Sequence, residues 1–96
     1  MQVTYQFRFD DPVTGSPRHF ILEAEVPYPQ VPRIGESVIV PTVYEGESLG
    51  ARRIDSVIYD SYGNIILDLL VDGLVLNFDM QVQILLNAGF WEIQPT

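Results

Sequence analysis

The sequence predicts a mainly β fold, either a small barrel or a strongly bent antiparallel sheet of about six to seven strands, with one short C-terminal helix. Three observations predict it. Apolar and polar residues alternate strictly near the start, short apolar runs lie between turn signals over residues 52–78, and three prolines interrupt the segment 27–32. With 96 residues, of which 47% are hydrophobic, the chain can bury one small core, so we expect residues 1–96 to form a single domain.

The first two strands follow from alternation. Over residues 2–9, one side of the strand is apolar and consists of Val3, Tyr5, Phe7 and Phe9. Residues 10–17 are rich in turn formers, and alternation resumes over 18–26, where Phe20, Leu22, Ala24 and Val26 are expected to face inwards. The pattern predicts a hairpin with a long loop.

The middle of the chain is irregular. Three prolines within residues 27–32 favour an extended crossing segment, because proline lacks an N–H and has a fixed φ. A short strand is predicted over Ser37 to Val40. Residues 42–50 have the weakest pattern, and we expect a mobile loop there.

Residues 52–78 have the pattern of three strands with two turns. The run Asp60 to Asn64 predicts a hairpin, with Gly63 or Asn64 in the left-handed conformation. Asp72-Gly73 suits a type I′ turn, which would pair Leu67 with Phe78 and Leu69 with Leu76 on one apolar face.

The last segment allows two interpretations. Residues 76–84 alternate as in a strand, whereas residues 80–88 also fit a short helix. Asp79 could cap such a helix, and Asp79, Gln83 and Asn87 would form a polar stripe, with Gly89 just after the helix end. We favour a helix over 80–88 and a last strand over 90–93, in which Trp91 belongs to the core or closes a barrel.

Part of this pattern resembles a known family. Pro32, Gly35, Glu36 and Val38 match a Pro–x–x–Gly–Asp/Glu–x–Val turn, and strands with apolar spacing like that of Ile54, Val57 and Tyr59 and of Ile65, Leu67 and Leu69 follow. In these features the chain resembles small bacterial and phage proteins with Src-homology-three-like (SH3-like) barrels. The resemblance covers roughly residues 31–71, and it transfers no functional residue because many such domains have no assigned activity.

The charge balance restricts the partners. The formal net charge is −8, all five basic residues are arginines, and from Ile54 to Thr96 there is no basic residue. Binding to nucleic acid or to an anionic membrane needs cations, so we expect neither, and we expect a protein partner that is basic or neutral. The start of the chain lacks the features of a signal peptide and no apolar run approaches ~20 residues, so we expect a cytoplasmic protein.

Few residues suit catalysis or metal binding. The chain has no cysteine and no lysine, and its single histidine, His19, is expected to be an exposed strand residue. A zinc site needs several histidine or cysteine ligands. Asp10-Asp11 could offer oxygens to calcium, but Asp before Pro is ordinary in turns. We therefore predict no catalytic residue, no cofactor and no metal site.

Aromatic residues beside acids form the candidate binding site. Tyr28 and Tyr44 lie in irregular segments, with Glu45 and Glu47 close by in sequence. Such groups can recognise a peptide that carries arginine or proline. The alternative is that the tyrosines only cover the ends of a barrel.

We expect a non-enzymatic protein-binding accessory module of bacterial or phage origin. The alternative is an acidic nucleic-acid mimic that inhibits a DNA-handling protein, and a small hydrolase is a distant third. The placement of the acidic residues distinguishes the first two, because a mimic should carry them in one stripe at phosphate-like spacing.

The charge predicts that the protein does not bind duplex or single-stranded DNA at about 0.1 M salt, where repulsion is only partly screened. Fluorescence anisotropy with labelled DNA measures this, and micromolar binding would contradict it.

The hydrophobic content also predicts a weak homodimer, formed through an edge strand or the late helix, because exposed apolar edges tend to associate. Light scattering tests it: a mass that stays at 10.9 kDa as the concentration rises would rule the dimer out.

Overall fold

The computed structural model describes residues 1–27, 29–40, 51–70 and 78–93 of the chain. In order along the chain, the elements are β1 (Gln2–Asp10), β2 (Pro17–Glu25), β3 (Ser37–Ile39), β4 (Ala51–Tyr59), β5 (Ile65–Leu69), α1 (Phe78–Asn87) and β6 (Trp91–Glu92).

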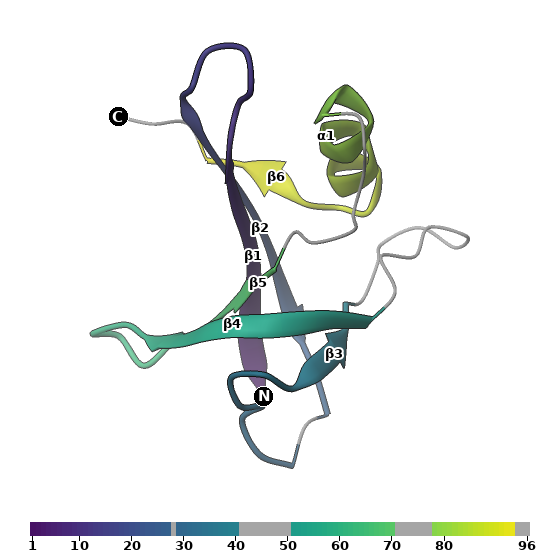
Figure 1. Cartoon of the computed structure of the whole chain (residues 1–96). Helices are drawn as coiled ribbons and strands as arrows, with labels where there is room; N and C mark the ends of the chain where they lie inside the picture. Colours follow the sequence, from purple (N-terminus) through teal and green to yellow (C-terminus); the bar gives the residue numbers. More distant parts are fainter. Residues whose placement is uncertain (28, 41–50, 71–77, 94–96) are drawn as a thin grey trace.

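The strands form one open, bent sheet in the order β3-β4-β5-β1-β2-β6. Neighbouring strands are antiparallel except for β1 and β5, which run parallel. Figure 1 shows that β4 crosses the direction of β1 and β2, and that α1 lies near β6, away from β3. The mainly β fold with one short helix is thus confirmed, and the six described strands form a bent sheet that does not close.

The β1–β2 hairpin is as the alternation predicts. Its register pairs Val3 with Ala24, Tyr5 with Leu22 and Phe7 with Phe20. In the loop, the Asp11 carboxylate accepts hydrogen bonds from the N–H groups of Val13, at 2.8 Å, and of Thr14. This local bonding is typical of Asp in turns.

The hairpin between β4 and β5 is also confirmed. The Asp60 carboxylate accepts hydrogen bonds from the N–H groups of Tyr62 and Asn64, both at 2.9 Å, and from the Asn64 side chain. Gly63 has φ +84°, in the left-handed region that side chains with a Cβ rarely adopt.

A β-bulge interrupts β4. Ile54 pairs with Leu69 and Ser56 pairs with Asp68, so Asp55 is an extra residue between two successive pairs. A bulge bends its strand and increases the local twist. The half of β4 that pairs with β3 therefore turns away from the half that pairs with β5.

The core lies on one face of this bent sheet. Among the described residues, the largest fully buried side chains are Val3, Tyr5, Phe7, Phe20, Ile54, Leu67 and Leu85. From the helix and its C-terminal end, Leu85 and Ala88 enter this core, and Phe90 lies against Phe7 with 5.4 Å between ring centroids. Such tilted aromatic pairs add to the free energy gained by burial.

The helix ends as the sequence predicts. Gly89 has φ +107°, its N–H donates to the Leu86 carbonyl, and the Phe90 N–H donates to the Leu85 carbonyl. These two bonds are the Schellman pattern, which satisfies carbonyls left unpaired at a helix end. On the polar stripe, the Gln83 amide donates to Asn87 Oδ1 at 2.8 Å. Asp79 is the second residue of the helix and lies in its first turn.

Two sequence predictions, for the strand pairing of Leu67 and for Trp91, are wrong. Leu67 does not pair with Phe78: it pairs with Tyr5 of β1 and Val57 of β4, so both edges of β5 are occupied, and Phe78 begins α1. Trp91 is not in the core but 46% exposed, because its neighbour Phe90 takes the inward position. The Asp72-Gly73 turn and residues 42–50 lie outside the described residues.

Within the described ranges, the chain contains no helix with the length and apolar character needed to cross a membrane.

Substituting Gly63 tests the β4–β5 turn. A Cβ at this position meets nothing within 4 Å, so the cost of Gly63→Val is conformational. We expect the free energy of unfolding to fall by about 1–3 kcal/mol, which for a domain of this size corresponds to a lower melting temperature by at least ~4 °C.

Gly63→Asn is the control, because Asn adopts the left-handed conformation more readily than Val. Equal melting temperatures for the two variants would contradict this account of the turn.

Candidate functional site

The face of the sheet opposite the core carries four bonded polar side chains on three adjacent strands, which we call the polar chain: His19, Gln6, Asp68 and Arg8. Arg8 Nη2 donates to Asp68 Oδ2 at 2.7 Å, and the Gln6 amide donates to Asp68 Oδ1 at 3.3 Å. Gln6 Oε1 can only accept, so His19 donates its Nε2–H to it over 2.7 Å.

The register of the strands brings the four residues of the polar chain together. Gln6 is opposite Asp68 in the parallel β1–β5 pair, and Arg8 is opposite His19 in the β1–β2 hairpin. Gln6 and Asp68 are buried, and in the part of the chain that the structure describes every buried side-chain nitrogen or oxygen has a partner. A buried polar group without a partner would cost on the order of 1–3 kcal/mol, so these residues stabilise one another.

The polar chain shifts two pKa values. The hydrogen bond that Arg8 donates to Asp68, and then the negative charge of Asp68, raise the pKa of Arg8. Burial, and then the positive charge of Arg8, lower the pKa of His19 from its ordinary value of 6.5, while Asp68 opposes that change. His19 is therefore neutral at pH 7 and half-buried, not the exposed strand histidine that the sequence predicts.

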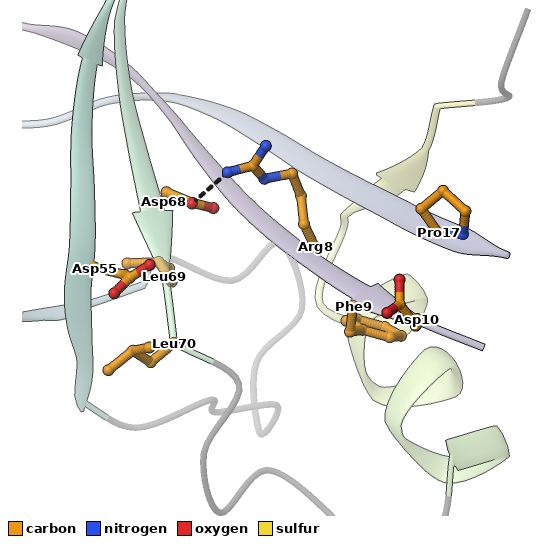
Figure 2. A pocket seen from close by; sticks show the side chains of 8 residues that line it. All are labelled: Arg8, Phe9, Asp10, Pro17, Asp55, Asp68, Leu69 and Leu70. Atoms are coloured by element: carbon orange, nitrogen blue, oxygen red, sulfur yellow. Dashed lines mark hydrogen bonds and ion pairs between the residues drawn. The ribbon is translucent and has the colours of Figure 1, made fainter. Parts of the chain in front are cut away.

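A hollow of about 410 Å³ lies beside the polar chain. Figure 2 shows Arg8 on β1 reaching towards Asp68 on β5, with Asp55 on β4 nearby. The lining residues are Arg8, Phe9, Asp10, Pro17, Asp55, Asp68, Leu69 and Leu70. Among the described lining residues there is no serine, threonine, cysteine, lysine or histidine. Asp68 could act as a base, but its carboxylate oxygens already accept hydrogen bonds from Arg8 and Gln6.

At the start of β2, next to His19 in the sequence, Arg18 forms a second ionic cluster. Its guanidinium bonds to Glu92 of β6 through Nε and, at 2.7 Å, through Nη2, and it lies 3.5 Å from Asp11. The pKa of Arg18 is raised chiefly by the Glu92 hydrogen bond, and that of Asp11 is lowered chiefly by the Val13 N–H. Asp11 thus serves the loop and this ion pair, while Asp10 is an exposed residue at the end of β1.

A different surface surrounds β3 at the opposite edge of the sheet. A hollow of about 430 Å³ lies between the segment 29–32 and β3, and is lined by Pro29, Gln30, Val31, Pro32, Glu36, Ser37, Val38 and Ile39. Val31 and Pro32 also line a second hollow, which includes Ile34 and Tyr59. Ile39 is 75% exposed, and Ile34 and Tyr59 are exposed as well. We call this region, residues 29–39 with Tyr59, the β3 surface.

The turn that opens β3 positions this surface. Gly35 has φ +88° and its N–H donates to the Ile54 carbonyl at 2.9 Å. The Glu36 carboxylate accepts the Arg33 N–H at 2.8 Å, and the Glu36 carbonyl accepts the Ile54 N–H at 2.8 Å. The residues of the SH3-like motif therefore do form a turn that begins a strand, while the family resemblance itself stays a prediction.

The sequence predictions and the structure single out different residues. The predicted partner-binding residues Tyr28, Tyr44, Glu45 and Glu47 lie outside the described residues. The sequence gives no signal for Gln6 and Asp68, because each sits at a polar position of its own strand and only the pairing of β1 with β5 brings them together. Ile34 and Ile39 also give no signal, since one exposed isoleucine is ordinary.

Comparison of the chain with protein-family models, with curated proteins and with solved structures found no match.

The polar chain predicts a pH dependence of stability. The pKa of His19 is lower in the folded protein than in the unfolded chain, so the unfolded chain binds the proton first as the pH falls. Stability is thus fully present above pH 6.5 and decreases as the pH falls from that value towards the folded pKa. The glutamine in His19→Gln cannot titrate but keeps an N–H that can reach Gln6. We therefore expect the free energy of unfolding of this variant to fall less than that of the wild type as the pH is lowered.

Urea unfolding between pH 7 and about pH 5.5 measures this, since ordinary carboxylates with pKa values of about 4 titrate little there. An identical decrease in wild type and variant would contradict the assignment to His19.

Proposed function

We propose that this protein is a non-enzymatic protein-binding accessory module, of bacterial or phage origin and cytoplasmic, which binds its partner through the β3 surface. The observation that carries the proposal is the gathering of exposed Ile34, Ile39 and Tyr59 around two hollows that share Val31 and Pro32. A cluster of exposed apolar side chains beside a concave surface is typical of a site for another protein.

The polar side chains support a non-enzymatic role. In an active site, a nucleophile or base should have a free lone pair directed into a pocket. Here the Asp68 carboxylate is held by Arg8 and Gln6, and His19 is bonded to Gln6. These contacts stabilise the junction of β5, β1 and β2 instead.

The acidic residues give less support to the alternative of a nucleic-acid mimic. Many of them serve the fold, and they are spread over several turns and strands: Asp11, Glu25, Glu36, Asp60, Asp68 and Glu92 each accept a hydrogen bond or form an ion pair. Residues engaged in this way are poorly placed to imitate a row of phosphates. The net charge of −8 favours a partner that is basic or neutral.

Affinity capture with matched variants tests the proposal. We expect wild-type protein to capture at least one partner from the cell that encodes it, and Ile39→Asp to lose that partner, because a carboxylate placed in an apolar contact must be desolvated. Quantitative mass spectrometry compares the captured proteins.

Val13→Asp is the control. Val13 is 90% exposed in the loop between β1 and β2, and this loop and β3 lie at opposite ends of the molecule (Figure 1). A partner lost equally from both variants, or retained by both, would contradict binding through the β3 surface.

A further inference from the structure

We infer, on the basis of the proposed function, how the partner binds: it supplies an extended, apolar and uncharged segment that adds as a new strand to the outer edge of β3. This mode, in which main-chain hydrogen bonds give affinity and side-chain pockets give specificity, is a general way for sheet proteins to bind peptides. Four features of the β3 surface support it.

The first feature is the direction of the main-chain groups of β3. The Ile54 N–H donates to the Glu36 carbonyl, so this carbonyl is directed towards β4, while the Glu36 N–H donates to the Arg33 carbonyl. In an antiparallel pair these groups alternate between the two sides of a strand, so Val38, opposite Arg52, also faces β4. Ser37 and Ile39 must then direct their N–H and C=O groups away from β4.

The second feature is the position of β3 at the end of the sheet. Among the described strands, β4 alone pairs with β3. Within the described ranges, the outward groups of Ser37 and Ile39 are therefore at an edge that no other strand occupies, and such an edge is a template for another extended chain. Ile39 presents both its main chain and its largely exposed side chain there.

The third feature is the shape of the space beside that edge. The segment 29–32 and β3 line the same hollow of about 430 Å³. An added strand would lie about 4.8 Å from β3, with its other side towards this segment. Pro29 and Pro32 have no N–H, so that wall presents few donors that need a partner.

This shape favours a single extended segment over a second copy of the chain. A second copy would have to pair its own β3 across the same edge, and it would bring its own 29–32 segment into the same space. A free peptide segment carries no such obstruction.

The fourth feature is the charge around the edge. The described charged residues around β3 are Arg33, Arg53 and Glu36, which are exposed, and Arg52, which is half-buried opposite Val38. Of these four residues, only Glu36 lines the hollow. Arg53 is opposite Ser37 on the neighbouring strand. The hollow is lined mainly by apolar groups, including Val31 and Ile39, so a segment with uncharged, apolar side chains fits best.

Hydrogen exchange measured by NMR tests the inference. The probe is a short synthetic peptide selected from a random displayed library on wild-type protein. We expect selected peptides to be apolar and uncharged, and saturation with one of them to slow amide exchange of Ser37 and Ile39 by about tenfold or more, with little change at Val38, which already bonds to β4.

Two variants at one position separate the main-chain contact from the side chain. Ser37→Ala keeps the outward N–H, whereas Ser37→Pro removes it and is tolerated at a strand edge. We expect Ser37→Pro to bind the peptide about tenfold more weakly than Ser37→Ala, because a buried carbonyl of the peptide loses its donor.

Each other outcome overturns strand addition: no peptide selected, equal binding by the two variants, exchange at Ser37 and Ile39 unchanged by the peptide, or exchange there already as slow as at Val38 in the free protein. If Ser37→Pro does not fold, exchange in the wild type still decides. A partner whose capture depends on Ile39 but leaves exchange unchanged would overturn strand addition alone, whereas the absence of such a partner would overturn the proposed function.

Discussion

The parallel pairing of β1 with β5 is the constraint on which the rest of this structure depends. It joins the N-terminal hairpin to the β4–β5 hairpin, two units that lie far apart in the sequence. A single hairpin is marginal in water, because it cannot bury its apolar face. Across this junction Tyr5 is opposite Leu67, and both are fully buried. The core therefore exists only once this long-range pair has formed.

The same junction sets the character of the opposite face. Because Tyr5 and Leu67 point into the core, the next residue of each strand, Gln6 and Asp68, points the other way and meets its partner there. Both side chains are buried, so their contact stabilises the fold most when every polar atom in it has a hydrogen-bond partner. Arg8, which bonds to Asp68, and His19, which bonds to Gln6, supply the remaining partners. A polar network of this kind favours one register of β1 against β5, since a shift by one residue would leave buried groups unpaired.

The sequence predicts local structure better than long-range structure. Alternation predicts β1 and β2, and the Asp60–Asn64 and Gly89 signals predict a turn and a helix end, because each depends on residues close together in the chain. The predicted pairing of Leu67 with Phe78 is wrong for a physical reason: an apolar strand such as 65–69 can be covered from either side, and nothing local shows that β1 takes that place. The prediction for Trp91 is wrong because one step of alternation decides whether it or Phe90 faces inwards. The polar chain and the β3 surface cannot be found from sequence, since both arise only from pairing.

The two ends of the sheet differ in a way that bears on binding. At one end, β6 has only two residues, and Glu92 carries a charge held by Arg18. Charge is a device that discourages a further strand, and so is short length, which β3 with its three residues shares. At the other end, β3 is Ser37, Val38 and Ile39, without charge or proline. The bulge at Asp55 turns this end relative to the main sheet, while Val38 of β3 still belongs to the core. An edge of this composition is normally covered or used, and the hollow beside the proline segment indicates the place where a partner's strand would cover it.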